Sequence, residues 1–429
     1  MSPTFRALRI RNYRLYALGG LVSNTGTWMQ RVAQDWLVLQ LYPGSAAEAS
    51  AALGVTTGLQ FLPILLFSPY AGLIADRMPK RRLLQLSQAW MGVTSLLLAV
   101  LALTGVVEPW MVFVIAFTFG VGAAFDAPAR QSFVSEMVGA EDLANAVGLN
   151  SASFNLARVL GPALSGLLIA ALGSGVRATG LVVLLNALSY VAVILALQAM
   201  SEHELTPADR VPRGKGMVRD GVRYVRRRPD LMLILVLAFF TGTFGMNFQM
   251  TSALMATQVF GKGPDEYGLL GTTFALGSLT AALLGARRVG RPRPGLVVAA
   301  ATAFGTVEIV LGLMPTYLTF MLLTPLLGLC LLTMLNAANT TLQLSVTPTM
   351  RGRVMALYMM VVMGGTPLGA PVVGWVGAAF GARWTLIGGG ALTIFGVLLA
   401  VALFGDARVM RRARRPATAD VAEHPALAA

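Results

Sequence analysis

Between residues 72 and 82 the chain reads Gly72-Leu-Ile-Ala-Asp76-Arg77-Met-Pro79-Lys80-Arg81-Arg82. This polar stretch separates two apolar runs, 51–74 and 83–104, and each is long enough for the roughly 20 residues that cross a bilayer. Gly72 allows two helices to approach closely, Asp76 closes the first helix, and a cluster of cations follows. A turn that only carries positive charge accounts for the cations, but not for Gly72 and Asp76 at this spacing. The stretch therefore predicts two membrane-spanning helices joined by a short and specific loop.

The composition of the whole chain agrees with a membrane location. Of 429 residues, 56% are hydrophobic and 12% are charged, and the mean hydropathy is +0.69. A soluble domain usually carries about 25% charged residues, because its surface faces water. The composition therefore disfavours a cytosolic enzyme, a nucleic-acid binder and a secreted domain.

Apolar runs of spanning length recur along the chain and predict twelve transmembrane helices. The runs are 14–41, 51–74, 83–104, 109–128, 145–172, 177–199, 231–257, 266–286, 295–314, 317–343, 353–380 and 384–405. Gly364, Gly365, Pro367 and Pro371 interrupt the eleventh run, so we expect a broken helix there. Broken helices are tolerated where they face protein or a cavity rather than lipid.

The cations are distributed unevenly between the two sets of loops. The two termini and every second loop between spans together hold 28 of the 33 Lys and Arg residues. The loops in between hold three, and Arg31 and Arg158 lie within spans. Cytoplasmic loops carry the excess of Lys and Arg, so both termini and the 200–229 loop are predicted to be cytoplasmic. The net charge of +14 then reflects topology and attraction to anionic membrane lipid, and not a nucleic-acid partner. Four cations precede a first apolar run that is too long for a cleaved signal, so we expect it to stay attached.

The chain also contains two related halves. The segment 200–229 is the only long polar interior stretch, and it divides six spans from six. QSFVSEMV at 131–138 resembles QLSVTPTM at 343–350, and GPALSG at 161–166 resembles GAPVVG at 369–374. We therefore expect a duplicated, all-α integral membrane protein with two six-helix pseudo-symmetric bundles. The expected domains are a bundle over 1–200, a cytoplasmic linker over 201–229, a bundle over 230–406 and a basic, disordered tail over 407–429.

The loop over 72–82 resembles the signature loop of the major facilitator superfamily, in which Gly-x-x-x-Asp-Arg-x-Gly-Arg-Arg joins helices 2 and 3. Pro79 stands where that signature has its second glycine, which stiffens the turn. The resemblance covers the whole chain through its twelve spans. It implies that Gly72, Asp76, Arg77 and Arg81 form a cytoplasmic gate with the start of the eleventh span, near Arg351 and Arg353, where the helix dipole favours a carboxylate.

Four further phrases look like the branch that contains the enterobactin exporter and related proton-driven drug exporters. They are Arg31-Val-Ala-Gln34-Asp35-Trp36-Leu-Val, Phe125-Asp126-Ala-Pro128-Ala-Arg130-Gln, Arg158-Val-Leu-Gly161-Pro162 and Arg351-Gly-Arg353-Val-Met-Ala-Leu-Tyr358. Gly161 and Pro162 also resemble the antiporter motif of drug/proton exporters. The resemblance implies efflux.

Charged residues inside a bilayer are costly, so each requires a partner or a function. Arg31 and Asp35 are four residues apart on one helix face and form either a permanent ion pair or a site where Asp35 exchanges a proton. Arg158 either pairs with a carboxylate on another span or binds an anionic group. Glu308 is either buried and protonated or faces a lateral cavity. These four residues are the proton-coupling candidates, whereas Asp126 and Arg130 are predicted to form a second gate latch.

Superfamily cavities are lined by the first, fourth, seventh and tenth spans. The candidate cavity residues on these spans are Asn24, Trp28, Gln34, Phe117, Phe244, Asn247, Phe248, Gln249, Asn336 and Asn339. About half of the amides are expected only to join helices. Amides mixed with aromatic rings suit a bulky, amphipathic organic solute such as a drug-like compound or a siderophore.

The sequence favours a secondary active transporter that exports such solutes by alternating access, driven by protons, with uptake by the same fold as the alternative. No nucleotide-binding loop of the type G-x-x-x-x-G-K-[ST] occurs, which disfavours direct use of ATP. A membrane-embedded enzyme is disfavoured because no span contains His and Cys330 is the only cysteine. We expect no cofactor and no metal, a monomer, and a location in the cell inner (plasma) membrane.

Overall fold

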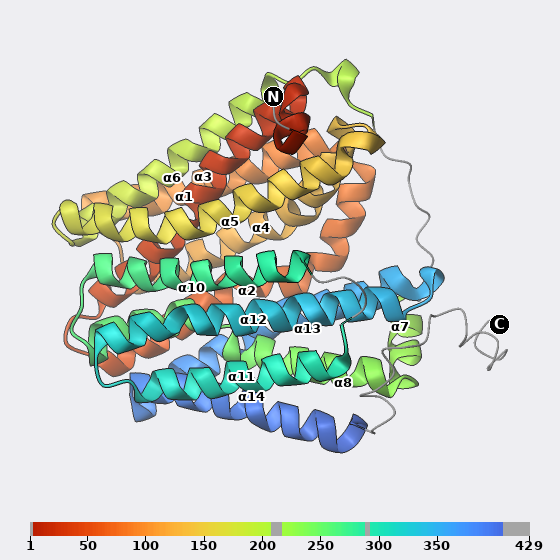
Figure 1. The fold of residues 1–429 in the computed structure, drawn as a ribbon. Coiled ribbons are helices and arrows are strands. Elements are labelled where there is room, and N and C mark those ends of the chain that lie inside the picture. The colour runs from red at the N-terminus through yellow and green to blue at the C-terminus, as the bar shows by residue number, and fades with distance from the viewer. Residues whose placement is uncertain (1–2, 207–216, 288–291, 406–429) are drawn as a thin grey trace. The chain divides into compact units, whose positions relative to one another are not determined.

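The computed structural model describes residues 3–206, 217–287 and 292–405. Within these ranges the chain forms helices and no strand, which confirms the predicted all-α class (Figure 1). The predicted tail over 407–429 and the middle of the predicted linker, 207–216, lie outside the described residues.

The described residues form twelve long helical segments, one for each predicted span. They are α1 (Arg11–Leu41), α2 (Ala46–Arg77), α3 (Lys80–Thr104), α4 (Pro109–Met137), α5 (Ala140–Ala171), α6 (Val176–Gln198), a composite segment (Pro229–Val259), α10 (Pro264–Ala286), α11 (Pro294–Leu313), α12 (Tyr317–Ser345), α13 (Pro348–Phe380) and α14 (Ala382–Phe404). Eleven of them are long and apolar enough to cross a membrane. The exception is α1, which has the length but carries amide and charged side chains along its second half.

The position of the broken helix differs from the expectation. The eleventh span is one continuous helix, α13, whereas the composite seventh segment consists of α8 (Pro229–Phe240) and α9 (Phe248–Leu254) with π-helical turns at Thr241–Gly245 and Met255–Val259. The glycines of α13 serve close packing instead. A Cβ atom at Gly365 would lie 2.7 Å from the Thr243 amide nitrogen, so only glycine lets α13 approach the first π-helical turn.

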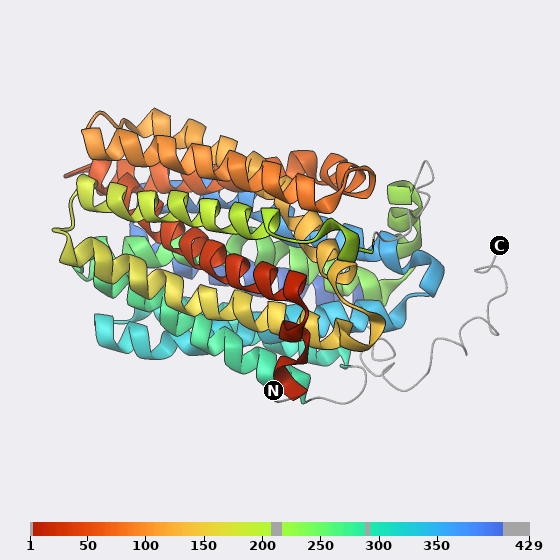
Figure 2. The same cartoon turned by 90° about the horizontal axis from the view of Figure 1, so that it is seen from above.

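The chain divides into two compact units. The first contains residues 1–212, 249–275 and 370–382. In it α1 lies against α5 and α6, α2 lies against α4, and α3 lies against α4 and α6. Figures 1 and 2 show the axes of α1, α3, α5 and α6 side by side. Tyr13, Tyr16, Leu84, Phe133 and Leu197 form part of its apolar core.

Two close approaches within this unit involve the paired sequence motifs. Gly166 of α5 faces Gly268 of α10, because a Cβ atom at Gly166 would lie 3.1 Å from the Gly268 Cα atom. Gly374 of α13 faces Gly54 of α2, with a corresponding distance of 2.8 Å. The small residues of GPALSG and GAPVVG therefore allow helix backbones to touch, as small residues commonly do in membranes.

The second unit contains residues 213–248, 276–369 and 383–429. Its core includes Leu231, Ile234, Val297, Met334 and Tyr358. A short helix, α7 (Met217–Arg226), occupies the end of the predicted linker, where the sequence analysis placed no helix. The predicted domain boundaries at 200 and 230 stay a prediction.

Candidate functional site

Asp35 is the one acidic residue of α1 and is buried, with 6% of its surface exposed. Its Oδ2 atom accepts a hydrogen bond of 2.7 Å from the Tyr267 hydroxyl and one of 3.0 Å from Gln249 Nε2. Both donors are neutral, and both belong to the segment 249–275 of the first unit. Gln249 was a predicted cavity residue, whereas Tyr267 was not a candidate.

Arg31 does not pair with Asp35. Among the described residues, no salt bridge within 4.0 Å joins the Arg31 side chain to a carboxylate. Its guanidinium carbon instead lies 4.7 Å from the ring centroid of Trp28 and 5.1 Å from that of Phe61. The Nε atom of Arg31 is buried and has no hydrogen-bond partner within the described ranges. Of the two hypotheses for this pair, the permanent ion pair does not describe the structure.

The guanidinium group of Arg158 on α5 also lies beside the Trp28 ring. Its guanidinium carbon lies 5.4 Å from the Trp28 centroid and 5.3 Å from that of Phe274. Trp28 also makes an edge-to-face contact with Phe154, with 6.0 Å between the centroids. Stacking on aromatic faces stabilises a cation in place of a carboxylate. Two cations and several aromatic rings thus surround Trp28, which the sequence analysis placed among the cavity candidates.

Gly161 and Pro162 hold α5 against the two helices that carry this cluster. A Cβ atom at Gly161 would touch the Trp28 side chain and lie 3.0 Å from the Thr25 carbonyl oxygen, so α1 and α5 are in backbone contact there. Pro162 lies on the face of α5 toward α10, because a Cβ atom at Gly271 of α10 would be 2.9 Å from the Pro162 Cβ atom. The motif therefore fixes the distance between α1, α5 and α10.

Two further candidates lie in the first unit near the same helices. Gln34 is buried, and its Nε2 donates to Gln60 Oε1 of α2 over 3.2 Å, while its Oε1 has no partner in the part of the chain that the structure describes. Asn24 and Phe117 are partly buried.

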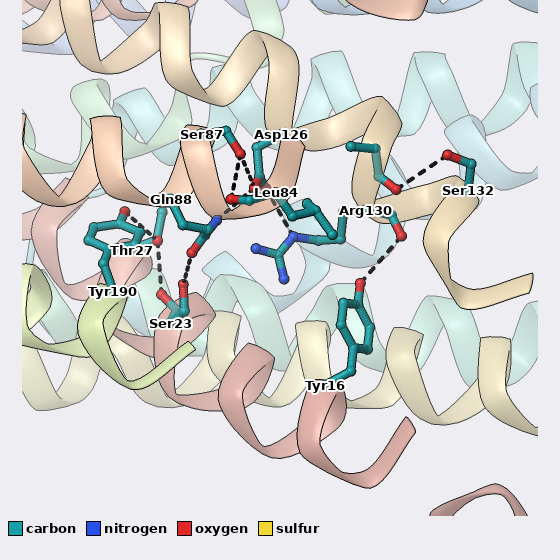
Figure 3. Close-up of polar contacts among 11 residues, drawn as sticks. Tyr16, Ser23, Thr27, Leu84, Ser87, Gln88, Asp126, Arg130, Ser132 and Tyr190 are labelled. Carbon is teal, nitrogen blue, oxygen red and sulfur yellow. Dashed lines mark hydrogen bonds and ion pairs between the residues drawn. The ribbon is translucent and has the colours of Figure 1, made fainter. Parts of the chain in front are cut away.

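Asp126 and Arg130 form a hydrogen-bonded network within the first unit, and their predicted role as a second gate latch stays a prediction. Arg130 Nε lies 2.9 Å from Asp126 Oδ2, as the spacing of four residues predicts. Asp126 Oδ1 accepts hydrogen bonds from Ser87 Oγ (3.0 Å) and Gln88 Nε2 (2.7 Å) of α3 (Figure 3).

The network continues to α1 and α6. Gln88 Oε1 accepts a hydrogen bond of 2.9 Å from Ser23, and the Thr27 and Tyr190 hydroxyls are 3.0 Å apart (Figure 3). Tyr16 donates to the Arg130 carbonyl oxygen over 3.3 Å. All these partners belong to the first unit, so the pair joins α1, α3, α4 and α6 to one another.

The residues of the predicted cytoplasmic gate are divided between the two units, so their meeting stays a prediction. Arg81 binds the end of α6, where its Nε donates to the Leu197 carbonyl over 2.7 Å and its Nη2 to that of Gln198 over 3.0 Å. Its Nη1 also lies 2.6 Å from Glu202 Oε1. The carbonyl groups at a helix end have no helical partners, and a cation satisfies them.

Arg353 pairs with Asp220 of α7 over 3.4 Å, within the second unit. Arg77 and Arg351 are exposed, and Gly72 is partly buried. The Asp76 side chain lies outside the described part of the structure, so its predicted role as a latch stays a prediction.

Glu308 is the deeply buried acid of the second unit, with 1% of its surface exposed. Its Oε2 atom has no hydrogen-bond partner among the described residues. A Cβ atom at Gly389 of α14 would lie 3.1 Å from Glu308 Oε1 and 2.9 Å from the Phe244 carbonyl oxygen. Glu308 therefore lies against α14, close to the first π-helical turn.

The remaining cavity candidates are mostly engaged within the second unit. Asn247 donates to the Thr243 carbonyl over 2.9 Å, and Asn339 accepts from Gln343 over 2.5 Å. Phe244 contacts Phe240, and Phe248 stacks on Phe320. Asn336 is partly buried and faces Gly285. Joining or stabilising helices is thus the observed role of several of these side chains.

Sequence reasoning missed Tyr267, Phe61 and Phe274, which contact the charged residues of the first unit. Each lies in an apolar run with no pattern that distinguishes it from a lipid-facing aromatic residue. Only the packing of α1 and α5 with α2 and α10 brings these rings to the charges.

Comparisons with known proteins agree with this fold. The model of the family described as "Transmembrane secretion effector" matches residues 2–420. The chain is 27% identical to the multidrug efflux pump Tap of Mycolicibacterium fortuitum, over 90% of this chain and 93% of that protein. It is 25% identical to the staphyloferrin A transporter of Staphylococcus aureus, over 60% of this chain and 63% of that protein.

A solved structure shows the same fold. It is a bacterial homologue of the human lysosomal transporter Spinster, in an inward-facing and unoccupied conformation. The TM-score is 0.71 at 15% identity, and the match covers 97% of this chain and 99% of that one. The chain therefore belongs to the transmembrane secretion effector family of the major facilitator superfamily, whose members are multi-pass membrane transporters.

Proposed function

We propose that this transporter is a proton-coupled exporter of small amphipathic organic molecules, drug-like compounds or siderophores, and that it works by alternating access. The efflux pump and the siderophore transporter among its relatives support the substrate class and the direction. The proposal places it in the inner (plasma) membrane as a monomer with both termini in the cytoplasm.

The observation that carries the proposal is the environment of Asp35. A carboxylate in the outer half of a membrane helix is held by two neutral donors, Tyr267 and Gln249, and not by a cation. An ionised carboxyl group only accepts hydrogen bonds, whereas a protonated one also donates. Protonation of Asp35 therefore weakens the contact that holds α1 to α9 and α10, and release of the proton restores it.

Alternating access follows if this contact breaks and reforms in each cycle. The protein needs a group whose charge changes while the site is exposed to one side of the membrane. Asp35 supplies that group in the first unit, and Glu308 is a second proton-coupling candidate in the other unit. Gly161 and Pro162 keep the distances between α1, α5 and α10 fixed throughout the transport cycle.

Everted membrane vesicles that express the chain provide the test. They are energised and offered a mixed library of macrolides, other drug-like compounds and siderophores, and accumulated solutes are identified by mass spectrometry. We expect solutes that accumulate above the level of vector-only vesicles, and we expect a proton uncoupler to abolish this accumulation. Asp35→Asn should abolish it as well, because the amide cannot exchange a proton.

Glu48→Gln is the matched control, because Glu48 is an exposed acid near the start of α2. This variant should transport as the wild type does. Full uncoupler-sensitive transport by Asp35→Asn would refute the role of Asp35. Accumulation in right-side-out vesicles instead of everted ones would favour the alternative, uptake by the same fold.

A further inference from the structure

Arg31 and Arg158 differ from the other well-buried arginines of the first unit in what they contact. Arg130 pairs with Asp126, and Arg81 binds the carbonyl groups at the end of α6. Arg31 and Arg158 have aromatic faces beside their guanidinium groups, and within the described residues no carboxylate oxygen lies within 4.0 Å of either.

The two guanidinium groups are close to each other. Both lie within 5.4 Å of the Trp28 centroid, so their central carbons are no more than about 11 Å apart. The nearby carboxylate, that of Asp35, is occupied by Tyr267 and Gln249. This region of a membrane helix bundle thus contains more positive than negative charge, an arrangement that a low-dielectric medium disfavours unless an anion is present.

We propose that Arg31, Arg158 and Trp28 bind the anionic group of the transported solute, so that the substrate class is the amphipathic organic anion, most simply a carboxylate on an aromatic or apolar body. The planar guanidinium group suits the two oxygens of a carboxylate. Phe61, Phe274 and Phe154 supply apolar faces for the body of the solute.

This inference rests on the proposed function and adds a division of labour to it. A guanidinium group stays protonated in proteins and cannot release a coupling proton. Arg31 and Arg158 therefore recognise the solute, whereas Asp35, next to them on α1, exchanges the proton.

A matched pair of fluorescent probes tests the proposal with the full-length protein in uncharged maltoside micelles. Pyrenebutyrate carries the carboxylate, and pyrenebutanol is its neutral counterpart. Bound pyrene quenches tryptophan fluorescence, and a titration gives the apparent Kd of each probe. We expect the wild type to bind pyrenebutyrate about tenfold more tightly than pyrenebutanol, as one charge-assisted contact implies.

The variants assign that preference to the two arginines. Arg31→Gln and Arg158→Gln should each lower the ratio of the two Kd values to about one to threefold while changing the pyrenebutanol Kd by less than about twofold. Arg158→Lys should keep part of the preference, because it retains the charge without the planar fork. Arg14→Gln, an exposed arginine on the same helix, should keep the full preference. Size-exclusion profiles that match the wild type show that each variant is folded.

Equal affinity of the wild type for the two probes, or an unchanged preference in both glutamine variants, would overturn the proposal. The anion could also be the phosphate of a lipid, which adding phosphatidylglycerol to the micelles distinguishes. We expect equimolar phosphatidylglycerol to change the pyrenebutyrate Kd by less than about twofold, because the probe and not the lipid occupies the arginines. Displacement of the probe by the lipid would assign the site to a headgroup and reject a solute site.

The proposed function and this inference can fail separately. Uncoupler-sensitive export by a protein with no carboxylate preference would reject the anion site and leave the exporter intact. A clear carboxylate preference without export in energised vesicles would leave the site and reject the exporter.

Discussion

Asp126 stabilises the first unit because one buried carboxylate satisfies donors from two helices. Its two oxygens accept from Ser87, Gln88 and Arg130, and only 8% of its surface is exposed. Removal of the carboxylate leaves the Arg130 guanidinium without its charged partner in a low-dielectric setting. The loss of a partner from a buried ion pair costs several kcal/mol, far more than the loss of an exposed pair.

We therefore expect Asp126→Ala to lower the free energy of unfolding by about 3 kcal/mol and Asp126→Asn to lower it by less, because the amide oxygen still accepts a hydrogen bond. Thermal unfolding of the purified protein, followed by fluorescence-detected size exclusion, measures the shift in Tm. Glu48→Ala at an exposed position serves as the control and should leave Tm unchanged. A wild-type Tm for Asp126→Ala would show that the network contributes nothing to stability.

Helical spacing predicted one of the two charged pairs and failed for the other. Asp126 and Arg130 are paired as their separation of four residues indicates. Arg31 and Asp35 have the same separation, but Asp35 bonds to Gln249 and Tyr267, which lie more than 200 residues away in the chain. Spacing reports only which side chains share a helix face. It does not report which partner another helix brings to that face.

At the scale of a helix, Gly161 and Gly148 of α5 form a natural comparison. A Cβ atom at Gly161 would collide with Trp28 and the backbone of α1, whereas nothing lies within 4 Å of such an atom at Gly148. Both substitutions to alanine favour the helix by a similar amount, so their difference isolates packing. We expect Gly161→Ala to lower stability by about 1–3 kcal/mol relative to Gly148→Ala, as overpacking does.

The Tm values of these two variants, measured side by side, check this expectation. Export activity in the vesicle assay should fall with Gly161→Ala, because the displaced Trp28 no longer lies between Arg31 and Arg158. Equal Tm and equal export for the two variants would mean that α1 and α5 separate at Gly161 without cost.

The number of helices was predictable from the sequence, but the site of the helix interruption was not. Apolar runs gave all twelve segments, because a spanning helix needs a length of apolar residues that few other structures require. Gly364, Gly365, Pro367 and Pro371 nevertheless lie in a continuous helix, while the π-helical turns occur in a segment whose one proline, Pro229, is its first residue. Glycine indicates either a break or a close approach, and only the neighbouring helix decides between them.

At the scale of the molecule, the distribution of cations makes a topological prediction. The segments that hold 28 of 33 cations should all face the cytoplasm. Alkaline phosphatase fused after Ser201 or at the C-terminus of the chain should be inactive, whereas a fusion after Gly173, between α5 and α6, should be active. Green fluorescent protein at the same positions should give the opposite pattern. An active phosphatase at the C-terminus would reject the predicted orientation.

The duplicated motifs take part in equivalent contacts. Gly166 lies in GPALSG and approaches Gly268, whereas Gly374 lies in GAPVVG and approaches Gly54. Residues 166 and 374 occupy the same place in the two motifs, and Gly54 and Gly268 lie on the second and eighth spans, which are equivalent under duplication. The fifth span thus contacts the eighth, and the eleventh span contacts the second. Two related halves would produce such a reciprocal pair of contacts, which supports the proposed pair of bundles.

Alternating access requires that contacts at one side of the membrane break in every cycle, and Ser50 with Gln258 offers such a contact. Gln258 Nε2 donates to the Ser50 hydroxyl over 3.2 Å and to the Ala46 carbonyl over 3.0 Å, so α2 meets the second π-helical turn at the end predicted to be external. Asp35 makes its own contacts to Gln249 and Tyr267 in the same unit. If protonation of Asp35 breaks the contact between Ser50 and Gln258 in each cycle, the transporter cannot cycle while a covalent bridge joins these two positions.

We therefore expect a short bis-thiosulfonate crosslinker to abolish export by the double variant Ser50→Cys, Gln258→Cys, built in a Cys330→Ser background to remove the native thiol. Reduction of the bridge should restore export, and each single cysteine variant should be insensitive to the reagent. Binding of pyrenebutyrate by the bridged protein then separates recognition from movement. Export that continues at the wild-type rate with the bridge formed would mean that α2 and the second π-helical turn stay together throughout transport, and the gate must then be sought elsewhere.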